Sequence, residues 1–251
     1  MSVPVIFDIE TGALPLEILR QVVPAFEPPK HPGEFNEKNV KLGNATKPET
    51  IAKKIEDARA KHADAVERYS LDLEQAEAKY WEDVLDKAAL SALTGEVLAI
   101  GYRGEKVTID FQGDRSEAMM LATFWKQYKS LRSVGRKMVG FNIGGFDMPF
   151  IVQRSWILGI PVPDSVFIGP QRYLDQTFID LMKLWSAGQW GAFTKLDTIC
   201  KCLGIPGKPE GINGGDFARL FRNPETQQQA IDYLNNDLDM TFGVAERLGV
   251  C

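Results

Sequence analysis

Residues 3–12 read Val-Pro-Val-Ile-Phe-Asp-Ile-Glu-Thr-Gly, and this stretch decides the fold of the chain. Its apolar run over 3–7 is typical of a buried strand that ends at Asp8. Side chains two residues apart in a strand project from the same face, so Asp8 and Glu10 can converge on one cation. The pattern recurs at Asp72-Leu-Glu74 in a helical context, where such side chains diverge by about 200°. The first copy is therefore the candidate site.

Beyond this stretch, strand-like and helix-like patterns alternate along the chain. Alternating or continuous apolar runs predict strands over 97–102, 106–111 and 137–141, the first two joined as a hairpin by Arg103-Gly-Glu105. Helical periodicity predicts helices over 116–131, 146–158 and roughly 225–248. This order predicts an α/β domain, with a mixed β-sheet flanked by helices.

A segment of different amino-acid composition interrupts the predicted domain. Residues 24–48 contain five prolines and predict an extended loop, whereas 49–92 contain neither Gly nor Pro. Apolar side chains recur there at helical spacing, and either one long helix or a helical hairpin fits them; they are Ile51, Ile55, Ala58, His62, Ala65 and Tyr69. We predict a domain formed by 1–23 and 93–251, with 24–92 inserted as a proline-rich loop and helical arm.

Composition and charge exclude several classes of function. The 251 residues are 44% hydrophobic, without a leader pattern or an apolar run long enough to cross a membrane, so we expect no membrane association and a cytoplasmic location. Three cysteines do not make a disulfide framework. The net charge is −5, but 49–92 alone holds seven basic and eleven acidic residues. The nearly neutral remainder is compatible with a nucleic-acid substrate.

The histidines restrict the chemistry further. Only His31 and His62 occur, both in the insert, which argues against histidine-dependent nucleophiles and histidine zinc sites. Carboxylates, hydroxyls, lysines or oxygen-held metals must then carry any catalysis.

Two further motifs supply carboxylates. Asn142-Ile-Gly-Gly-Phe-Asp147 lies where a strand passes into a helix, and Asp147 there could simply favour the helix dipole. Tyr233-Leu-Asn-Asn-Asp237 places a phenol and a carboxylate on one helical face, although Tyr233 could equally be a core residue.

The order and setting of the three motifs resemble the DEDD family of 3′–5′ exonucleases, which has a ribonuclease H-like fold. The tyrosine marks the DEDDy branch. Asp180-Leu-Met and Leu203-Gly-Ile-Pro-Gly-Lys208 look like a subgroup related to the exonuclease domains of family B DNA polymerases. The resemblance covers residues 1–23 and about 93–248.

The resemblance implies a two-metal mechanism with Mg²⁺ or Mn²⁺, ions that favour oxygen ligands. Asp8 would bridge both ions, Glu10 and Asp237 would bind the first, and Asp147 the second. Tyr233 would orient the attacking water, because a phenol is a poor base at neutral pH. Substrate contacts would come from Thr11, Leu14, Asn142 and Phe146, although packing roles fit these residues about as well.

The expected function is a metal-dependent 3′–5′ exonuclease acting on the 3′ end of single-stranded DNA. The alternatives are an exoribonuclease, a non-catalytic nucleic-acid-binding module, and a proofreading or repair subunit recruited by a replication or repair protein through the arm. Five basic residues between 126 and 137 fit a solvated helix face better than a phosphate grip, and Asp180 and the stripe around Cys200 fit structural roles.

Overall fold

The structure is a computed structural model that describes residues 4–167, 175–189, 191, 193–208 and 214–251. The expected strand residue Val3 lies outside the described residues. The chain divides into two compact units, Met1–Val22 with Lys87–Cys251, and Val23–Asp86. We refer to the first as the body and to the second as the arm.

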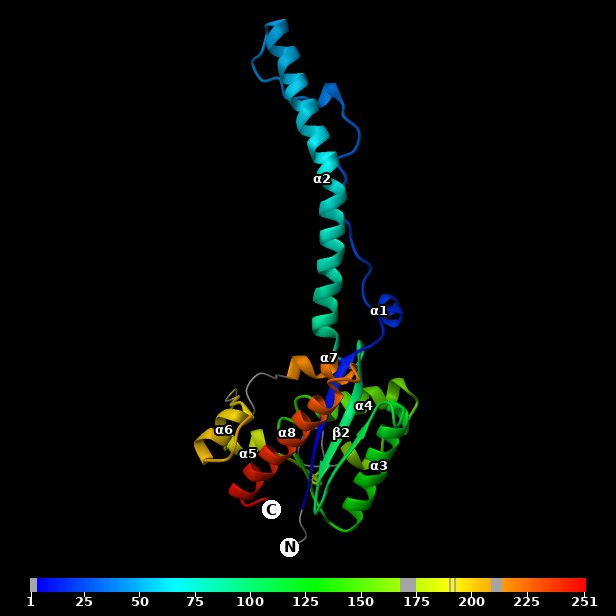
Figure 1. The fold of residues 1–251 in the computed structure, drawn as a ribbon, viewed down its shortest axis with the longest axis vertical. Helices are drawn as coiled ribbons and strands as arrows, with labels where there is room; N and C mark the ends of the chain where they lie inside the picture. Colours follow the sequence, from blue (N-terminus) through cyan, green and yellow to red (C-terminus); the bar gives the residue numbers. More distant parts are fainter. Residues whose placement is uncertain (1–3, 168–174, 190, 192, 209–213) are drawn as a thin grey trace. The chain divides into compact units, whose positions relative to one another are not determined.

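A five-stranded mixed sheet forms the centre of the body (Figure 1). Its order is β3-β2-β1-β4-β5, with β1 antiparallel to β2 and parallel to β4. The strands are β1 (Val5–Ala13), β2 (Gly95–Arg103), β3 (Val107–Phe111), β4 (Met138–Gly140) and β5 (Phe178–Asp180). The predicted α/β fold with a mixed sheet is confirmed.

Helices cover both faces of the sheet, and each face has its own apolar core. Phe7 packs with the helices α3 (Glu117–Ser133) and α4 (Asp147–Ile157), whereas Ile6 packs on the opposite face with α8 (Gln227–Arg247). Figure 1 shows α3 and α4 on one side of the strands and α8 on the other. The remaining helices of the body are α1 (Leu16–Val22), α5 (Leu181–Trp185), α6 (Leu196–Leu203) and α7 (Phe217–Phe221), with 3₁₀ turns at Asp164–Phe167 and Gly214–Asp216.

The first strand differs from its predicted extent. It continues to Ala13, with a bulge between Glu10 and Thr11. Asp8 therefore lies within the strand instead of at its end. The extension arises because Thr11–Ala13 pair with Gly95–Val97 of β2, a partner that local sequence does not reveal.

The arm consists of one continuous helix and the chain segment that runs beside it. Helix α2 (Pro48–Ala88) has 41 residues and continues past the arm's last residue, so the single-helix alternative is the observed one. Proline at its first position is favourable, since the N–H that proline lacks would have no helical partner there.

The proline-rich segment lies antiparallel along α2 and contacts it at three levels. Aromatic rings meet at Phe26–Tyr80, His31–Tyr69 and Phe35–His62, with centroids 5.7, 4.6 and 5.5 Å apart. No residue from 23 to 86, a range that is described throughout, is fully buried. The segment thus half-covers the apolar stripe of α2 without forming a core.

None of the described helices is long and apolar enough to cross a membrane. Cys200, Cys202 and Cys251 are all free thiols, and Cys200 is buried in the core on the α8 side of the sheet.

Candidate functional site

The strand β1 and the helix α8 bring three carboxylates together. Asp8 and Glu10 project from the same face of β1 as Ile6, and this face packs on α8, which carries Asp237. Opposite Asp8 on β2 stands Gly101. A Cβ atom at Gly101 would lie 2.7 Å from Leu238 Cδ1, so the glycine permits α8 to approach the sheet closely.

The three carboxylates form a compact cluster. Asp8, Glu10 and Asp237 each offer an oxygen atom, and these atoms lie within 4.8 Å of one another. Asp237 is only 8% exposed, and its Oδ1 atom is buried without a hydrogen-bond partner among the described residues. A buried acceptor without a donor is costly, which points to a cation as its missing partner.

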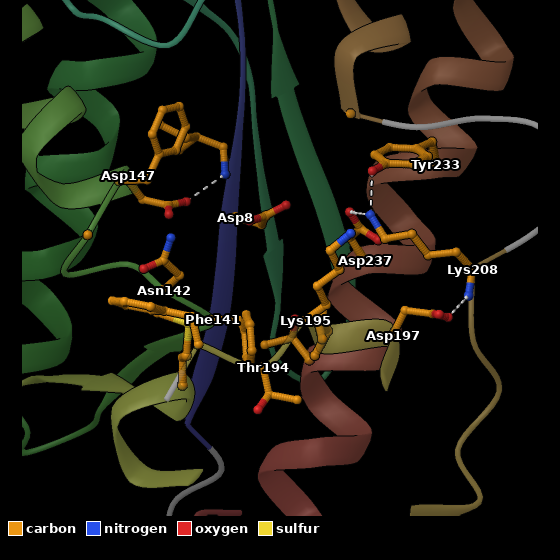
Figure 2. Close-up of a pocket in the computed structure, with 18 of the residues that line it drawn as sticks. Asp8, Phe141, Asn142, Asp147, Thr194, Lys195, Asp197, Lys208, Tyr233 and Asp237 are labelled. Carbon is orange, nitrogen blue, oxygen red and sulfur yellow. Dashed lines mark hydrogen bonds and ion pairs between the residues drawn. The ribbon is translucent and has the colours of Figure 1, made fainter. Parts of the chain in front are cut away.

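Asp147 approaches Asp8 from the other side of β1, as the first residue of α4 (Figure 2). Its Oδ1 atom accepts a hydrogen bond from the Ile9 N–H at 3.2 Å. The four predicted acids therefore converge on one stretch of strand, from three separate elements.

The turn before Asp147 is held by Asp180. Its carboxylate accepts hydrogen bonds from the N–H groups of Asn142 and Gly144, both at 3.0 Å. Asn142, not a glycine, adopts the left-handed conformation, with φ of 61°. The glycine at 145 instead lets the Asn142 side chain pack close to the backbone, because a Cβ at Gly145 would lie 2.4 Å from Asn142 Oδ1.

Lys208 is a member of the site that sequence reasoning missed. Its ammonium group donates a hydrogen bond to the Tyr233 hydroxyl and forms an ion pair with Asp237 Oδ2 at 2.9 Å. The backbone N–H of Lys208 is bonded to Asp197 Oδ1 at 3.1 Å, which holds the segment after α6 against the site (Figure 2). A lysine four residues after Leu-Gly was visible in the sequence, but nothing local indicated where its side chain points.

Burial of like charges dominates the electrostatics. Desolvation, with the charges of neighbouring carboxylates, raises the pKa of Asp8 and Glu10 well above their usual range. Burial raises the pKa of Asp147 to about 7, and it also raises the pKa of Asp237. A divalent cation would relieve this repulsion, so the donor set fits a metal that prefers oxygen.

The site opens into a cleft of about 1160 Å³. Within the described part of the chain, six of the predicted residues line it: Asp8, Asn142, Phe146, Asp147, Tyr233 and Asp237. Its other walls are mostly apolar or basic, with Phe141, Met182, Phe193, Lys195 and Lys201 among them. Figure 2 shows Phe141 and Asn142 on the side of the cleft opposite Tyr233 and Lys208.

Two predicted substrate contacts have other partners in the structure. The Thr11 hydroxyl donates to the Ala89 carbonyl at 2.7 Å, next to the end of α2. Leu14 is buried, and its N–H is bonded to the Thr94 carbonyl at 2.9 Å. Their assignment as substrate contacts stays a prediction.

Among the five basic residues between 126 and 137, one in the last turn of α3 and one after it have partners in the structure. Arg132 pairs with Asp175 at 2.8 Å, and the Lys137 ammonium donates to the Gln176 carbonyl at 2.8 Å.

The fold is that of a ribonuclease H-like domain of the polymerase-exonuclease type. The chain belongs to the family described as predicted 3′–5′ exonucleases related to the exonuclease domain of PolB, whose model matches residues 96–249. Asp8 and Glu10 precede the matched residues.

Three individual proteins are similar to parts of this chain. An uncharacterised protein of Methanocaldococcus jannaschii is 26% identical over 66% of this chain and 93% of its own length. DNA polymerase 2 of Aeropyrum pernix is 23% identical over 60% of this chain. The family B DNA polymerase of Pyrobaculum calidifontis matches in structure with a TM-score of 0.53, at 19% identity over 65% of this chain. This chain spans only 20% and 23% of the two polymerases.

Proposed function

We propose that this protein is a metal-dependent 3′–5′ exonuclease that hydrolyses the terminal phosphodiester of single-stranded DNA. The observation that carries the proposal is the cluster of Asp8, Glu10 and Asp237, with its unpartnered buried oxygen. Membership of a family described as exonuclease-like supports the same reaction class.

The residues that would hold metal are Asp8, Glu10, Asp147 and Asp237. Two Mg²⁺ or Mn²⁺ ions bound there would activate a water for attack and stabilise the charge on the leaving oxygen. The four carboxylates also repel one another. Binding a cation relieves this repulsion, which favours occupancy of the site.

Tyr233 orients the water in this proposal. Burial, with the charge of Asp237, raises the pKa of Tyr233 to about 12, so the phenol keeps its proton at neutral pH. Lys208 donates to the phenol oxygen, and the phenol's own proton is directed to Asp237, where a bound water or phosphate oxygen would compete for it. The hydroxyl therefore acts as a positioning donor, because a protonated phenol cannot accept the water's proton.

The cleft supports an unpaired strand end as substrate. Phe141, Phe146 and Phe193 offer faces on which unstacked bases can pack without regard to sequence. Lys195 and Lys201 offer cations to the backbone phosphates at the same cleft.

The test uses 5′-labelled DNA and RNA strands of one sequence, each incubated with Mg²⁺, with Mn²⁺ and with chelator. We expect a ladder of products that shortens from the 3′ end. Cleavage should occur with Mg²⁺ or Mn²⁺ but not with chelator, and DNA should be cleaved faster than RNA. Faster cleavage of RNA would make the protein an exoribonuclease. Binding without cleavage would make it a non-catalytic module.

The chain offers a matched control for this test. Asp8→Asn should abolish cleavage. Asp72→Asn changes the same residue type in the second Asp-x-Glu copy, on α2, and should leave cleavage unchanged. Full cleavage by the Asp8→Asn protein would refute the site assignment.

A further inference from the structure

Charge is segregated along the arm. We call residues 37–61 the tip, and residues 23–36 with 62–86 the shaft. The tip holds seven basic and four acidic residues, a net charge of +3, whereas the shaft holds three basic and ten acidic, a net of −7. The tip is thus a basic patch in a protein whose overall charge is −5.

The tip is a contiguous surface because its two chain segments are bonded to one another. Arg59 on α2 pairs with Glu37 and lies over the Phe35 ring, with its guanidinium carbon 5.5 Å from the centroid. The Lys54 ammonium donates to the Leu42 carbonyl at 2.7 Å. These contacts hold the loop against the first turns of the helix.

Most of the tip's cations have no internal partner. Glu37 is already engaged by Arg59. Five other lysines are exposed, and none of their ammonium groups forms an ion pair with any residue that the structure describes: Lys38, Lys41, Lys47, Lys53 and Lys61.

The stretch of the tip between Glu37 and Glu49, residues 38–48, is free of acids. It contains three of these lysines together with the polar side chains of Asn39, Asn44 and Thr46. Gly43, with φ of 57°, allows the loop to turn there. Lysine, amide and hydroxyl groups are the side chains that contact nucleic-acid phosphates and sugars.

The apolar surface of the arm lies elsewhere. Its exposed large hydrophobic side chains are Val66, Leu71 and Leu85, all in the shaft. Protein interfaces depend on buried apolar or aromatic anchors, which the tip does not expose. Phosphate binding needs only cations and donors, so the tip favours a polyanionic strand over an acidic protein.

We propose that the tip of the arm is a second, sequence-independent binding site for the nucleic-acid backbone, separate from the catalytic cleft. The choice of nucleic acid as ligand rests on the proposed function. The acidic shaft repels the strand, so contact is confined to the tip. A long strand presents more phosphates to each basic site than a short one, so the tip contributes most to the binding of long strands.

The experiment measures binding without hydrolysis. Fluorescence anisotropy of a short and a long 5′-labelled single strand is recorded in chelator over a range of salt concentrations. The tip variant carries Lys38→Gln, Lys41→Gln and Lys47→Gln. The control removes the same charge from the shaft through Lys30→Gln, Arg68→Gln and Lys79→Gln.

We expect the tip variant to lose about tenfold or more in affinity for the long strand at low salt. The slope of log affinity against log salt should fall by about 2, since three phosphate contacts at ~0.7 each are removed. The shaft control should lose much less affinity for the long strand than the tip variant, and its salt slope should stay close to that of the unchanged protein. A third variant with arginine at the three tip positions should retain binding, which excludes misfolding as the cause.

Equal slopes for the tip and shaft variants would overturn the proposal. The proposal would also be overturned if the tip variant bound the strand as the unchanged protein does but no longer bound an acidic protein partner. The tip would then be a protein-docking site. The outcome is independent of the exonuclease assay. A protein that cleaves short strands but shows no tip effect would refute this inference alone, and the reverse result would refute the proposed function alone.

Discussion

The Asp147 carboxylate accepts a hydrogen bond from the N–H of Ile9, the residue between Asp8 and Glu10. The bond joins groups 138 residues apart in sequence. It fixes the first turn of α4 to the strand that carries two of the four acids. The geometry of the acidic site therefore depends on this contact and not on either motif alone.

The stability of the metal-free protein should fall as pH rises from about 4 to about 7. Burial raises the pKa of Asp147 to about 7, and Asp180 adds to the effect, while backbone hydrogen bonds from Asp147 and Ile9 oppose it. Between the unfolded and folded pKa values the folded state binds more protons, so raising the pH favours unfolding. The slope is at most about 1.4 kcal/mol per pH unit for one group.

Thermal unfolding in chelator across this pH range measures the effect. Asp147→Asn keeps an acceptor for the Ile9 N–H but removes the titrating group, so its profile should be flatter. A metal-free protein that gains stability as pH rises through this window would contradict the assignment.

Tyr233→Phe should slow hydrolysis by about 10–1000-fold with metal affinity nearly unchanged. The ring packs near Phe217, with centroids 6.5 Å apart, and the substitution keeps that packing. Single-turnover rates and Mn²⁺ titration separate the two effects. Turnover at the unchanged rate would make Tyr233 a core residue only.

Lys208→Met should tighten metal binding and lower the stability of the metal-free protein. Burial opposes the charged form of Lys208, but Asp237 and Tyr233 outweigh it and raise its pKa. The ammonium is thus the cation that compensates the acids when metal is absent. We expect Mn²⁺ to bind about tenfold tighter, with a loss of several degrees in the chelator melting temperature.

The matched control is Lys201→Met. Lys201 pairs with Asp197 at 2.6 Å, but its side chain is 71% exposed, where such pairs contribute little. Equal effects of the two substitutions on metal affinity would show that Lys208 has no special role.

The arm should be dispensable for the chemistry. Replacing residues 24–86 with a short Gly-Ser linker should preserve metal-dependent cleavage of very short strands and weaken binding of long ones. Extending the deletion to residue 91 removes the carbonyls that accept from Thr11 and Thr94. The longer deletion should therefore lower the free energy of unfolding by a further ~1 kcal/mol or more per lost hydrogen bond.

Urea unfolding of the two deletion proteins measures the difference, and cleavage of a short strand checks the site. If the shorter deletion folds and binds Mn²⁺ yet cleaves nothing, the arm contributes to catalysis and the separation of roles is wrong.

The sequence alone determined the features that depend on local periodicity. The two-residue step of β1 placed Asp8 and Glu10 on one face, and the four-residue step of α8 aligned Tyr233 with Asp237. The strand and helix order predicted the mixed sheet. Helix boundaries differed by one or two residues, as at α8, expected over 225–248 and observed at Gln227–Arg247.

The tertiary structure decided what depends on contacts between distant segments. Lys208 belongs to an irregular segment, so no period could show that its ammonium reaches Tyr233 and Asp237. The spacing along α2 fitted one helix or two, and the choice depended on the proline-rich segment that half-covers its apolar stripe. Side-chain periodicity records which face of an element is buried, but the partner on that face is set by packing across the whole chain.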